Sequence, residues 1–526
     1  MPPSPVTSSR GRVAAWLLLA FAAAAGLGWW WSKGRPVALP DAPSARIACV
    51  SYGPFRLPGE TPLDPHAFVS PARIDADLRA LSRRFDCVRT YSQGQGLSAV
   101  PSIARRYGMK VMMGIWLGSD PRANAREVAQ GIAMARAYPQ VLRGVIVGNE
   151  VLLRSDLSPR ALAGYIRQVR AAIPASVPVT YADVWEDWLR YPQMAKAVDY
   201  LTVHILPYWE NDPVSPEHAV RHVADVYARM RRRFPGRTIV IGETGWPSEG
   251  RPRRTAEPSV VNEARYLRGF LAYAATVNMP YNVFDAFDQP WQRVQEGTVG
   301  GYWGIFDTRA RPKFPMRGPV TELPRWWLGW LAALAGALLF VAAGTWRRRW
   351  RGIHGWLAQA LAGTGVGSAM AWQARQMVQA CTNPWEWLLS AGACALALYV
   401  ALALSRAIAA RLAGLREVPP PWRGWRFGWL FALAWYGLLE AFDGRYRDFP
   451  LGLFALPCVG YAALALLRRD APMPSPEQRF LAAGVTLLGI VIVVQERGEN
   501  PSAWLWLGLC LAIALPVFVD GRRARP

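Results

Sequence analysis

Apolar residues are concentrated at one end of this chain. Residues 326–519 consist mainly of long runs rich in Ala, Leu, Gly and Trp, whereas residues 32–325 have the mixed composition of a soluble α/β domain. A helical run of about 20 apolar residues can cross the hydrocarbon core of a bilayer. At 52% hydrophobic residues the chain also lacks the composition of a disordered protein. A purely soluble protein is therefore excluded, and we expect a polar domain joined to a membrane domain.

A separate apolar stretch lies near the start of the chain, at residues 13–31. It follows Arg10 and Arg12 and ends on three tryptophans. Signal peptides have a shorter apolar region followed by a small-residue cleavage site. The near-bilayer length and the aromatic end favour an uncleaved transmembrane anchor, while the alanine run at 22–25 leaves cleavage open.

About seven further spans are predicted in the last third of the chain. They lie at 326–346, 353–372, 385–404, 427–442, 450–467, 480–494 and 502–519. Arginines gather in the loops after the first, third, fifth and seventh of these spans: Arg347, Arg348, Arg349, Arg351, Arg406, Arg411, Arg416, Arg423, Arg426, Arg468, Arg469, Arg522, Arg523 and Arg525. Positively charged loops stay in the cytoplasm, so these loops and both termini are expected inside. Arg375, Glu386 and Glu440, within or at the ends of spans, are expected to reach the lipid–water interface.

The resulting organisation has five parts. A cytoplasmic N-terminus is expected at 1–12, the anchor at 13–31, a linker at 32–45, a domain outside the membrane at 46–322, and a membrane domain with about seven transmembrane helices at 323–526.

The net charge of +23 alone would suggest a nucleic-acid partner. The charge is almost entirely arginine, however, and much of it lies beside apolar spans, where membrane topology explains it. No helix-turn-helix, zinc-finger or RNA-recognition pattern accompanies it. We therefore expect no nucleic-acid partner.

Two of the six cysteines, Cys49 and Cys87, fall in neighbouring predicted strands. A disulfide between them is compatible with an oxidising compartment, but two buried free thiols are the favoured interpretation. Three of the others lie within apolar spans, and no cysteine has zinc-ligand spacing.

The polar domain alternates short β-rich runs with amphipathic stretches. Strands are expected at 45–52, 87–91, 110–116, 141–148, 177–183, 200–206, 237–242 and 281–287, and helices at 73–84, 122–137, 158–172, 216–233 and 259–277. Eight strand–helix units in about 270 residues predict an α/β fold, a (β/α)8 TIM barrel.

Two glutamates occupy the positions where such barrels carry catalytic groups. Glu150 closes the fourth predicted strand and Glu243 the seventh. Catalytic residues of these barrels lie at the carboxyl ends of the strands, and strands four and seven face each other across the barrel mouth. Two carboxylates placed in this way can flank a glycosidic bond, one as acid/base and the other as nucleophile.

Other strand-end residues are candidates for binding a sugar. Asn149 could donate a hydrogen bond to a sugar hydroxyl, and aromatic rings could stack on pyranose faces, although each ring could equally be a core residue of the barrel rim. His204 could touch substrate or be a satisfied rim residue. The candidate set is Tyr52, Tyr91, Trp116, Asn149, Asp183, His204, Tyr208, Trp246, Asp288, Trp291 and Glu296, with Trp185 as a further aromatic.

Two other sequence patterns are weaker evidence for a binding site. Residues 94–99 fit GxGxxA but follow the second strand, so a barrel loop is preferred to a dinucleotide site. His218 and His222 have helical i, i+4 spacing without a third ligand, so solvated histidines are preferred to a metal site. We expect no cofactor and no metal.

Several motifs of this domain resemble glycoside hydrolase family 17. They are YGPF (52–55), RTYS (89–92), VGNEV (147–151), GETGWPS (242–248), FDAFDQPWQ (284–292) and EGTVGGYWGIFD (296–307). This is the β-1,3-glucanase family of plants and fungi, which has bacterial membrane-bound members, including proteins named β-(1,6)-glucan synthases. The resemblance implies a retaining barrel with Glu150 as acid/base and Glu243 as nucleophile.

The resemblance also implies a substrate and a location. The expected partner is β-1,3-linked glucan, with β-1,6 branches as an option, and the expected location is a bacterial inner membrane with the barrel in the periplasm. A membrane-bound β-1,3-glucan transglycosylase is the favoured function. A hydrolase, or a non-catalytic glucan-binding or export subunit beside a separate membrane glycosyltransferase, is the alternative. Asp285, Gln289 and Gln292 depart from the Glu, Glu and Lys of fungal relatives, which bears on linkage and acceptor preference.

Overall fold

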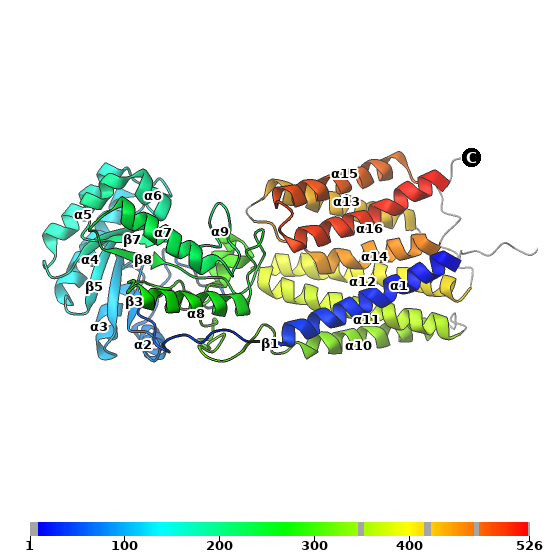
Figure 1. Ribbon diagram of the computed structural model, residues 1–526, viewed down its shortest axis with the longest axis horizontal. Coiled ribbons are helices and arrows are strands. Elements are labelled where there is room, and N and C mark those ends of the chain that lie inside the picture. Colours follow the sequence, from blue (N-terminus) through cyan, green and yellow to red (C-terminus); the bar gives the residue numbers. More distant parts are fainter. Residues whose placement is uncertain (1–8, 346–351, 415–421, 445, 468–472, 524–526) are drawn as a thin grey trace, which may run out of the picture. The chain divides into compact units, whose positions relative to one another are not determined.

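The structure is a computed structural model that describes residues 9–345, 352–414, 422–444, 446–467 and 473–523 (Figure 1). The chain forms two compact units. The barrel unit comprises Val37–Gly250 and Thr255–Val320, and the helical unit comprises the chain up to Pro36, the short segment Arg251–Arg254 and the chain from Thr321.

A parallel sheet of seven strands forms the centre of the barrel unit. Its order follows the sequence: β2 (Val50–Ser51), β3 (Cys87–Arg89), β4 (Lys110–Ile115), β5 (Leu142–Asn149), β6 (Val179–Val184), β7 (Leu201–His204) and β8 (Ile239–Glu243). Helices connect the strands: α2 (Pro71–Leu81), α3 (Val100–Arg106), α4 (Pro121–Ala137), α5 (Pro159–Ala172), α6 (Trp185–Arg190), α7 (Ala219–Arg233) and α8 (Val260–Thr276). In Figure 1 these helices surround the strands.

An irregular segment closes the sheet into a barrel. Tyr281 bridges Ile241 of β8 and Val283 bridges Val50 of β2, both in parallel. The amide of Val283 donates to Cys49 O at 3.0 Å, and Ser51 donates back to Val283 O at 2.9 Å. The predicted (β/α)8 fold is thereby confirmed, with the eighth strand reduced to bridges.

Local sequence fixes where the barrel helices begin. Ser70, Asp120, Ser158 and Ser259 each accept a hydrogen bond from a backbone amide of the following helical turn. Three of these helices have proline in the first turn, where its fixed φ suits the helix and its missing N–H costs nothing. The short connections leave the strand ends on one rim free to carry functional residues.

Cys49 and Cys87 form a disulfide, so the expectation of free thiols was wrong. Strands β2 and β3 are parallel, and Val50 pairs with Val88. The two cysteines, one residue earlier on each strand, therefore lie opposite each other with their Cα atoms 4.3 Å apart. That separation is short enough for a bridge, but sequence alone did not reveal the register.

The helical unit consists of long helices. They are α1 (Ser9–Gly34), α10 (Trp327–Thr345), α11 (Ile353–Ala380), α12 (Pro384–Leu412), α13 (Trp422–Phe442), α14 (Leu451–Leu467), α15 (Pro476–Gln495) and α16 (Pro501–Arg523). Within the described residues five of them, α1, α10, α12, α15 and α16, are long and apolar enough to cross a membrane. The length and apolar composition of these helices suit membrane association.

Most of the arginines on which the predicted membrane orientation depends lie outside the described residues. Residues 347–349, 351, 416, 468, 469 and 525, and the side chains of 423, 522 and 523, lie outside the described part. Glu440, expected at the lipid interface, is instead buried. Its carboxylate accepts from the backbone amide of Asp448 at 3.4 Å, and its backbone carbonyl accepts from Arg447 at 2.7 Å.

A buried ion pair joins the loop between α13 and α14 to the end of α15. Arg447 contacts Glu496 at 2.5 Å, and both side chains are almost inaccessible. The second carboxylate oxygen of Glu496 accepts from Asn500 at 3.1 Å and from the backbone amide of Arg254 at 2.9 Å. Arg251 stacks over Tyr446 at 4.8 Å. These contacts explain why Arg251–Arg254 belong to the helical unit.

Candidate active site

Two carboxylates meet at the carboxyl ends of β5 and β8. Glu150 directly follows β5, the fourth strand of the sheet, and Glu243 is the last residue of β8, the seventh. Together with His204 they present oxygen and nitrogen atoms within 4.8 Å of one another. Glu150 has a φ of 52°, in the left-handed region. A non-glycine residue held there is strained, and such strain is typical of functional sites.

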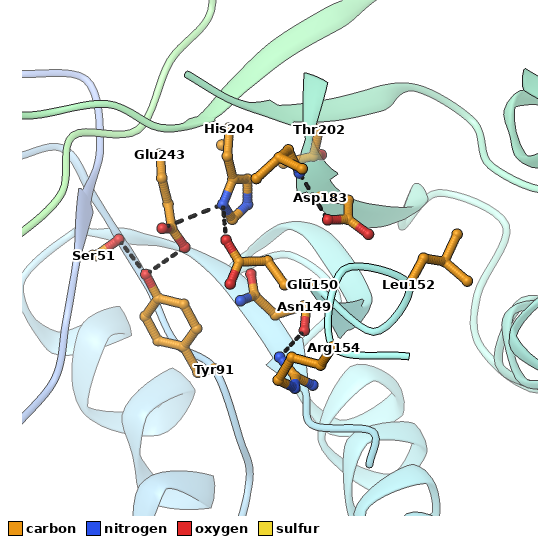
Figure 2. A network of polar contacts seen from close by, with 12 residues as sticks. Ser51, Tyr91, Asn149, Glu150, Leu152, Arg154, Asp183, Thr202, His204 and Glu243 are labelled. Atoms are coloured by element: carbon orange, nitrogen blue, oxygen red, sulfur yellow. Dashed lines mark hydrogen bonds and ion pairs between the residues drawn. The ribbon is translucent and has the colours of Figure 1, made fainter. Parts of the chain in front are cut away.

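His204, at the end of β7, lies between the two glutamates (Figure 2). Its Nδ1 is 3.3 Å from Glu150 Oε1 and 3.2 Å from Glu243 Oε2. The imidazole is completely buried, which favours its neutral form, but the two carboxylates outweigh burial and raise the pKa of His204 to about 9. At neutral pH a charged imidazolium therefore bridges the pair.

Arg89, in β3, is the charged residue that the sequence analysis did not single out. It is 1% exposed, and its Nη1 lies 3.0 Å from Glu243 Oε1. It also donates to Gly242 O at 2.6 Å and to Asn149 Oδ1 at 2.5 Å. Burial raises the pKa of Glu243, but His204 and then Arg89 outweigh it, so the pKa falls to about 2. Glu243 is therefore ionised over the whole physiological range.

Three other predicted residues lie in this cluster. Tyr91 donates to Glu243 Oε1 at 2.9 Å, and Asn149 is held by Arg89. Asp183, at the end of β6, is buried, and burial together with the nearby charge of Glu150 raises its pKa to about 7, although its bond from Tyr181 opposes the shift. The site therefore sets an ionised carboxylate beside a second carboxyl group with a strained backbone.

Comparison with known proteins shows what the barrel resembles. Residues 49–304 match the sequence model of the BtgE/BtgC glycoside hydrolase domain. The barrel is therefore similar in sequence to a family of glycoside hydrolase domains. The resemblance drawn from its motifs is confirmed, and so is the expectation of an enzyme acting on glycosidic bonds.

Fungal relatives are similar in sequence to this chain over most of the barrel. A glucan 1,3-beta-glucosidase of Arthroderma benhamiae is 27% identical over 266 residues, which are 46% of this chain and 83% of the relative. A Candida albicans protein of the same name is 26% identical over 264 residues, 46% of this chain and 85% of its own. A β-1,3-glucanosyltransferase structure from Rhizomucor miehei is 26% identical, with a TM-score of 0.45, covering 52% of this chain and 97% of that one.

Three predicted aromatics of the glycoside hydrolase domain are core residues rather than exposed stacking surfaces. Tyr52, Tyr208 and Trp246 are at most 1% exposed. Tyr52 donates to Asp77 at 3.1 Å, while Tyr208 and Trp246 pack edge to face. Their side chains belong to the buried core of the barrel, which a strand-end position in the sequence does not specify.

The other predicted residues have mixed environments. Trp116 is 39% exposed, and Arg154 lies 4.4 Å from its ring centre, so it remains available for stacking. Trp185 and Trp291 are half-buried and bonded through their indole nitrogens to Glu210 and Gln289. Asp288 is buried in an ion pair with Lys313 at 3.0 Å, and Glu296 is half-buried in the short helix α9 (Arg293–Glu296).

A metal is a second possible occupant of the carboxylate cluster. Within the described residues, Glu150, His204 and Glu243 form a group that could ligate an ion. Arg89, 3.0 Å from Glu243, holds a fixed positive charge there that disfavours a cation. His222 instead contacts Glu210 at 3.0 Å and His218 contacts Ser215 at 2.9 Å, so these two histidines have different partners.

The raised pKa of His204 predicts how stability changes with pH. Its folded pKa of about 9 exceeds the unfolded value of about 6.5. The stabilisation is therefore complete below about pH 6.5 and is lost as the pH rises to about 9, by up to about 3 kcal/mol. We expect the melting temperature of the barrel to fall across this window. In His204→Gln the fall should be absent, and an equal slope in both proteins would contradict the assignment.

Proposed function

We propose that this chain is a membrane-bound, retaining β-1,3-glucan transglycosylase that works through a covalent glycosyl-enzyme. The observation that carries the proposal is the approach of Glu150, His204 and Glu243 to within 4.8 Å at the ends of the fourth and seventh strands. Retaining enzymes hold their two carboxyl groups close together, about 5–5.5 Å apart, whereas inverting enzymes need room for a water molecule. The close approach of one oxygen from each glutamate favours the retaining arrangement. The relatives named as glucan 1,3-beta-glucosidases support β-1,3-glucan as the substrate.

The first step forms the glycosyl-enzyme. The ionised Glu243 attacks the anomeric carbon, and the glycosidic C–O bond breaks. The leaving oxygen takes the proton of Glu150. The positive charges of His204 and Arg89 outweigh the effect of burial and keep Glu243 anionic until it attacks.

The second step releases the sugar. Glu150, now a carboxylate, takes a proton from a water molecule or from a sugar hydroxyl whose oxygen attacks the anomeric carbon. The bond to Glu243 breaks, and its electron pair returns to the carboxylate. Transfer to a sugar lengthens or branches a glucan, whereas transfer to water shortens it. A membrane-associated enzyme of glucan assembly fits transfer better than digestion.

We infer the location from the apolar helices and from the arginine distribution in the sequence. Five apolar helices support anchoring in a membrane, and the arginine distribution in the sequence supports a bacterial inner membrane with the barrel in the periplasm and both termini in the cytoplasm. A separate membrane glycosyltransferase that makes the glucan is a candidate partner.

Product analysis tests the proposal. Purified full-length protein is incubated with end-labelled β-1,3-gluco-oligosaccharides, without any nucleotide sugar, and the products are measured by mass spectrometry. We expect products longer than the donor together with the matching short fragment. Shortened products alone, at every acceptor concentration, would identify a hydrolase, and unchanged donor would favour a binding subunit.

A further inference from the structure

A chain of hydrogen bonds runs from the barrel closure to Glu243. Asn282, in the segment that closes the sheet, donates from Nδ2 to Ser51 Oγ at 2.9 Å. Ser51 Oγ lies 2.8 Å from the hydroxyl oxygen of Tyr91, and Tyr91 donates to Glu243 Oε1 at 2.9 Å. Figure 2 shows the part of this chain from Ser51 through Tyr91 to Glu243. Asn282 and Ser51 are completely buried.

The donor and the acceptor of each hydrogen bond in this series follow by elimination. Glu243 is an anion, so it can only accept, and the single hydrogen of Tyr91 must point to it. Tyr91 must then accept from Ser51, whose single hydrogen is used in that bond. Ser51 Oγ therefore accepts from Asn282.

A carbonyl group fixes the orientation of the Asn282 amide. Asn282 Nδ2 also lies 2.8 Å from Gly242 O, which can only accept. The amide nitrogen, rather than the amide oxygen, must therefore face both Ser51 and Gly242. Gly242 immediately precedes Glu243, so the same side chain also holds the backbone of the nucleophile.

We propose that Asn282 and Ser51 are positioning residues that act through Tyr91 to stabilise the negative charge of Glu243 when it leaves the sugar. This inference rests on the proposed glycosyl-enzyme. Donors arranged in one direction polarise one another, which makes the last donor stronger. Ser51 and Asn282 are too deeply buried to serve as substrate contacts.

The hydrogen-bonded series from Asn282 to Glu243 is expected to have opposite effects on the rates of the two chemical steps. In the first step Glu243 gives up negative charge, so a strong donor stabilises the starting carboxylate and restrains attack. In the second step Glu243 regains its charge, so the same donor stabilises the developing anion. Loss of the chain should therefore slow the second step without slowing the first. A general loss of packing would slow both.

The test separates the two steps with a 2-deoxy-2-fluoro β-glucosyl donor that has a good leaving group. Mass spectrometry of full-length protein follows the gain of the label and then its loss in the presence of an acceptor sugar. For Ser51→Ala we expect label loss to slow about fivefold, while label gain is not slowed. Asn282→Ala should shift the two rates in the same directions.

Thr180→Val is the matched control. Thr180, in β6, has a buried hydroxyl that bonds to Tyr181 O, Tyr200 O and Thr202, so its replacement removes a barrel hydroxyl outside the hydrogen-bonded series from Asn282 to Glu243. Both rates should stay within twofold of wild type. Equal slowing of both steps in Ser51→Ala, or no change in either, would overturn the inference and leave the function standing. Failure of the wild type to gain any label would overturn the covalent mechanism itself.

Discussion

Glu243→Ala is expected to reduce turnover of β-1,3-gluco-oligosaccharides on the order of 10⁴-fold, because removal of a nucleophile leaves only binding and charge stabilisation. The binding of the oligosaccharide should change little. Turnover is measured from product formation, and binding by titration calorimetry with the same oligosaccharide.

An α-glucosyl fluoride separates a missing nucleophile from a misfolded site. This donor has the anomeric configuration of the glycosyl-enzyme, so it needs only Glu150 as base to transfer its sugar to an acceptor. Glu243→Ala should therefore make transfer product from the fluoride. Glu217→Ala, at a glutamate whose side chain is 59% exposed, is the control and should retain full turnover. Normal turnover in Glu243→Ala would remove the mechanism.

Glu150→Ala is expected to reduce turnover of natural oligosaccharides by about 10³-fold, since a positioned general acid contributes about 10²–10⁴-fold. The loss should depend on the leaving group. A dinitrophenyl glucoside needs no protonation to depart, so its first step should be nearly normal and the glycosyl-enzyme should accumulate.

Azide distinguishes the acid/base from other roles of Glu150. This anion attacks without needing a base, so it should restore turnover of the dinitrophenyl glucoside and give a glucosyl azide that retains the β configuration. An α-configured azide, or an equal loss for both kinds of leaving group, would show that Glu150 acts in another way.

The strand-end glutamates could be predicted because two independent signals coincided. Each closes a β-rich run, and their separation corresponds to three strand–helix units of a barrel. Long amphipathic helices and apolar spans were equally accessible, since their periodicity and length follow directly from burial and bilayer thickness.

What escaped prediction depended on contacts between distant segments. Arg89 lies in the run CVRTY, where one charge among buried residues was a signal, but its partners are 60 or more residues away. The disulfide required the register of β2 against β3. The buried state of Tyr52 and Trp246 depended on which way each side chain points, and no local pattern encodes that direction.

The segment Arg251–Arg254 limits how the barrel can be produced as a separate fragment. It lies inside the span that matches the glycoside hydrolase domain, yet its four residues belong to the helical unit, where Glu496 accepts its backbone hydrogen bond. A fragment cut at both ends of the barrel would therefore include part of the helical unit and expose Arg251, which is buried in the full-length protein. Transfer of the barrel to another membrane anchor would therefore require exchange of the connection between β8 and α8 as well.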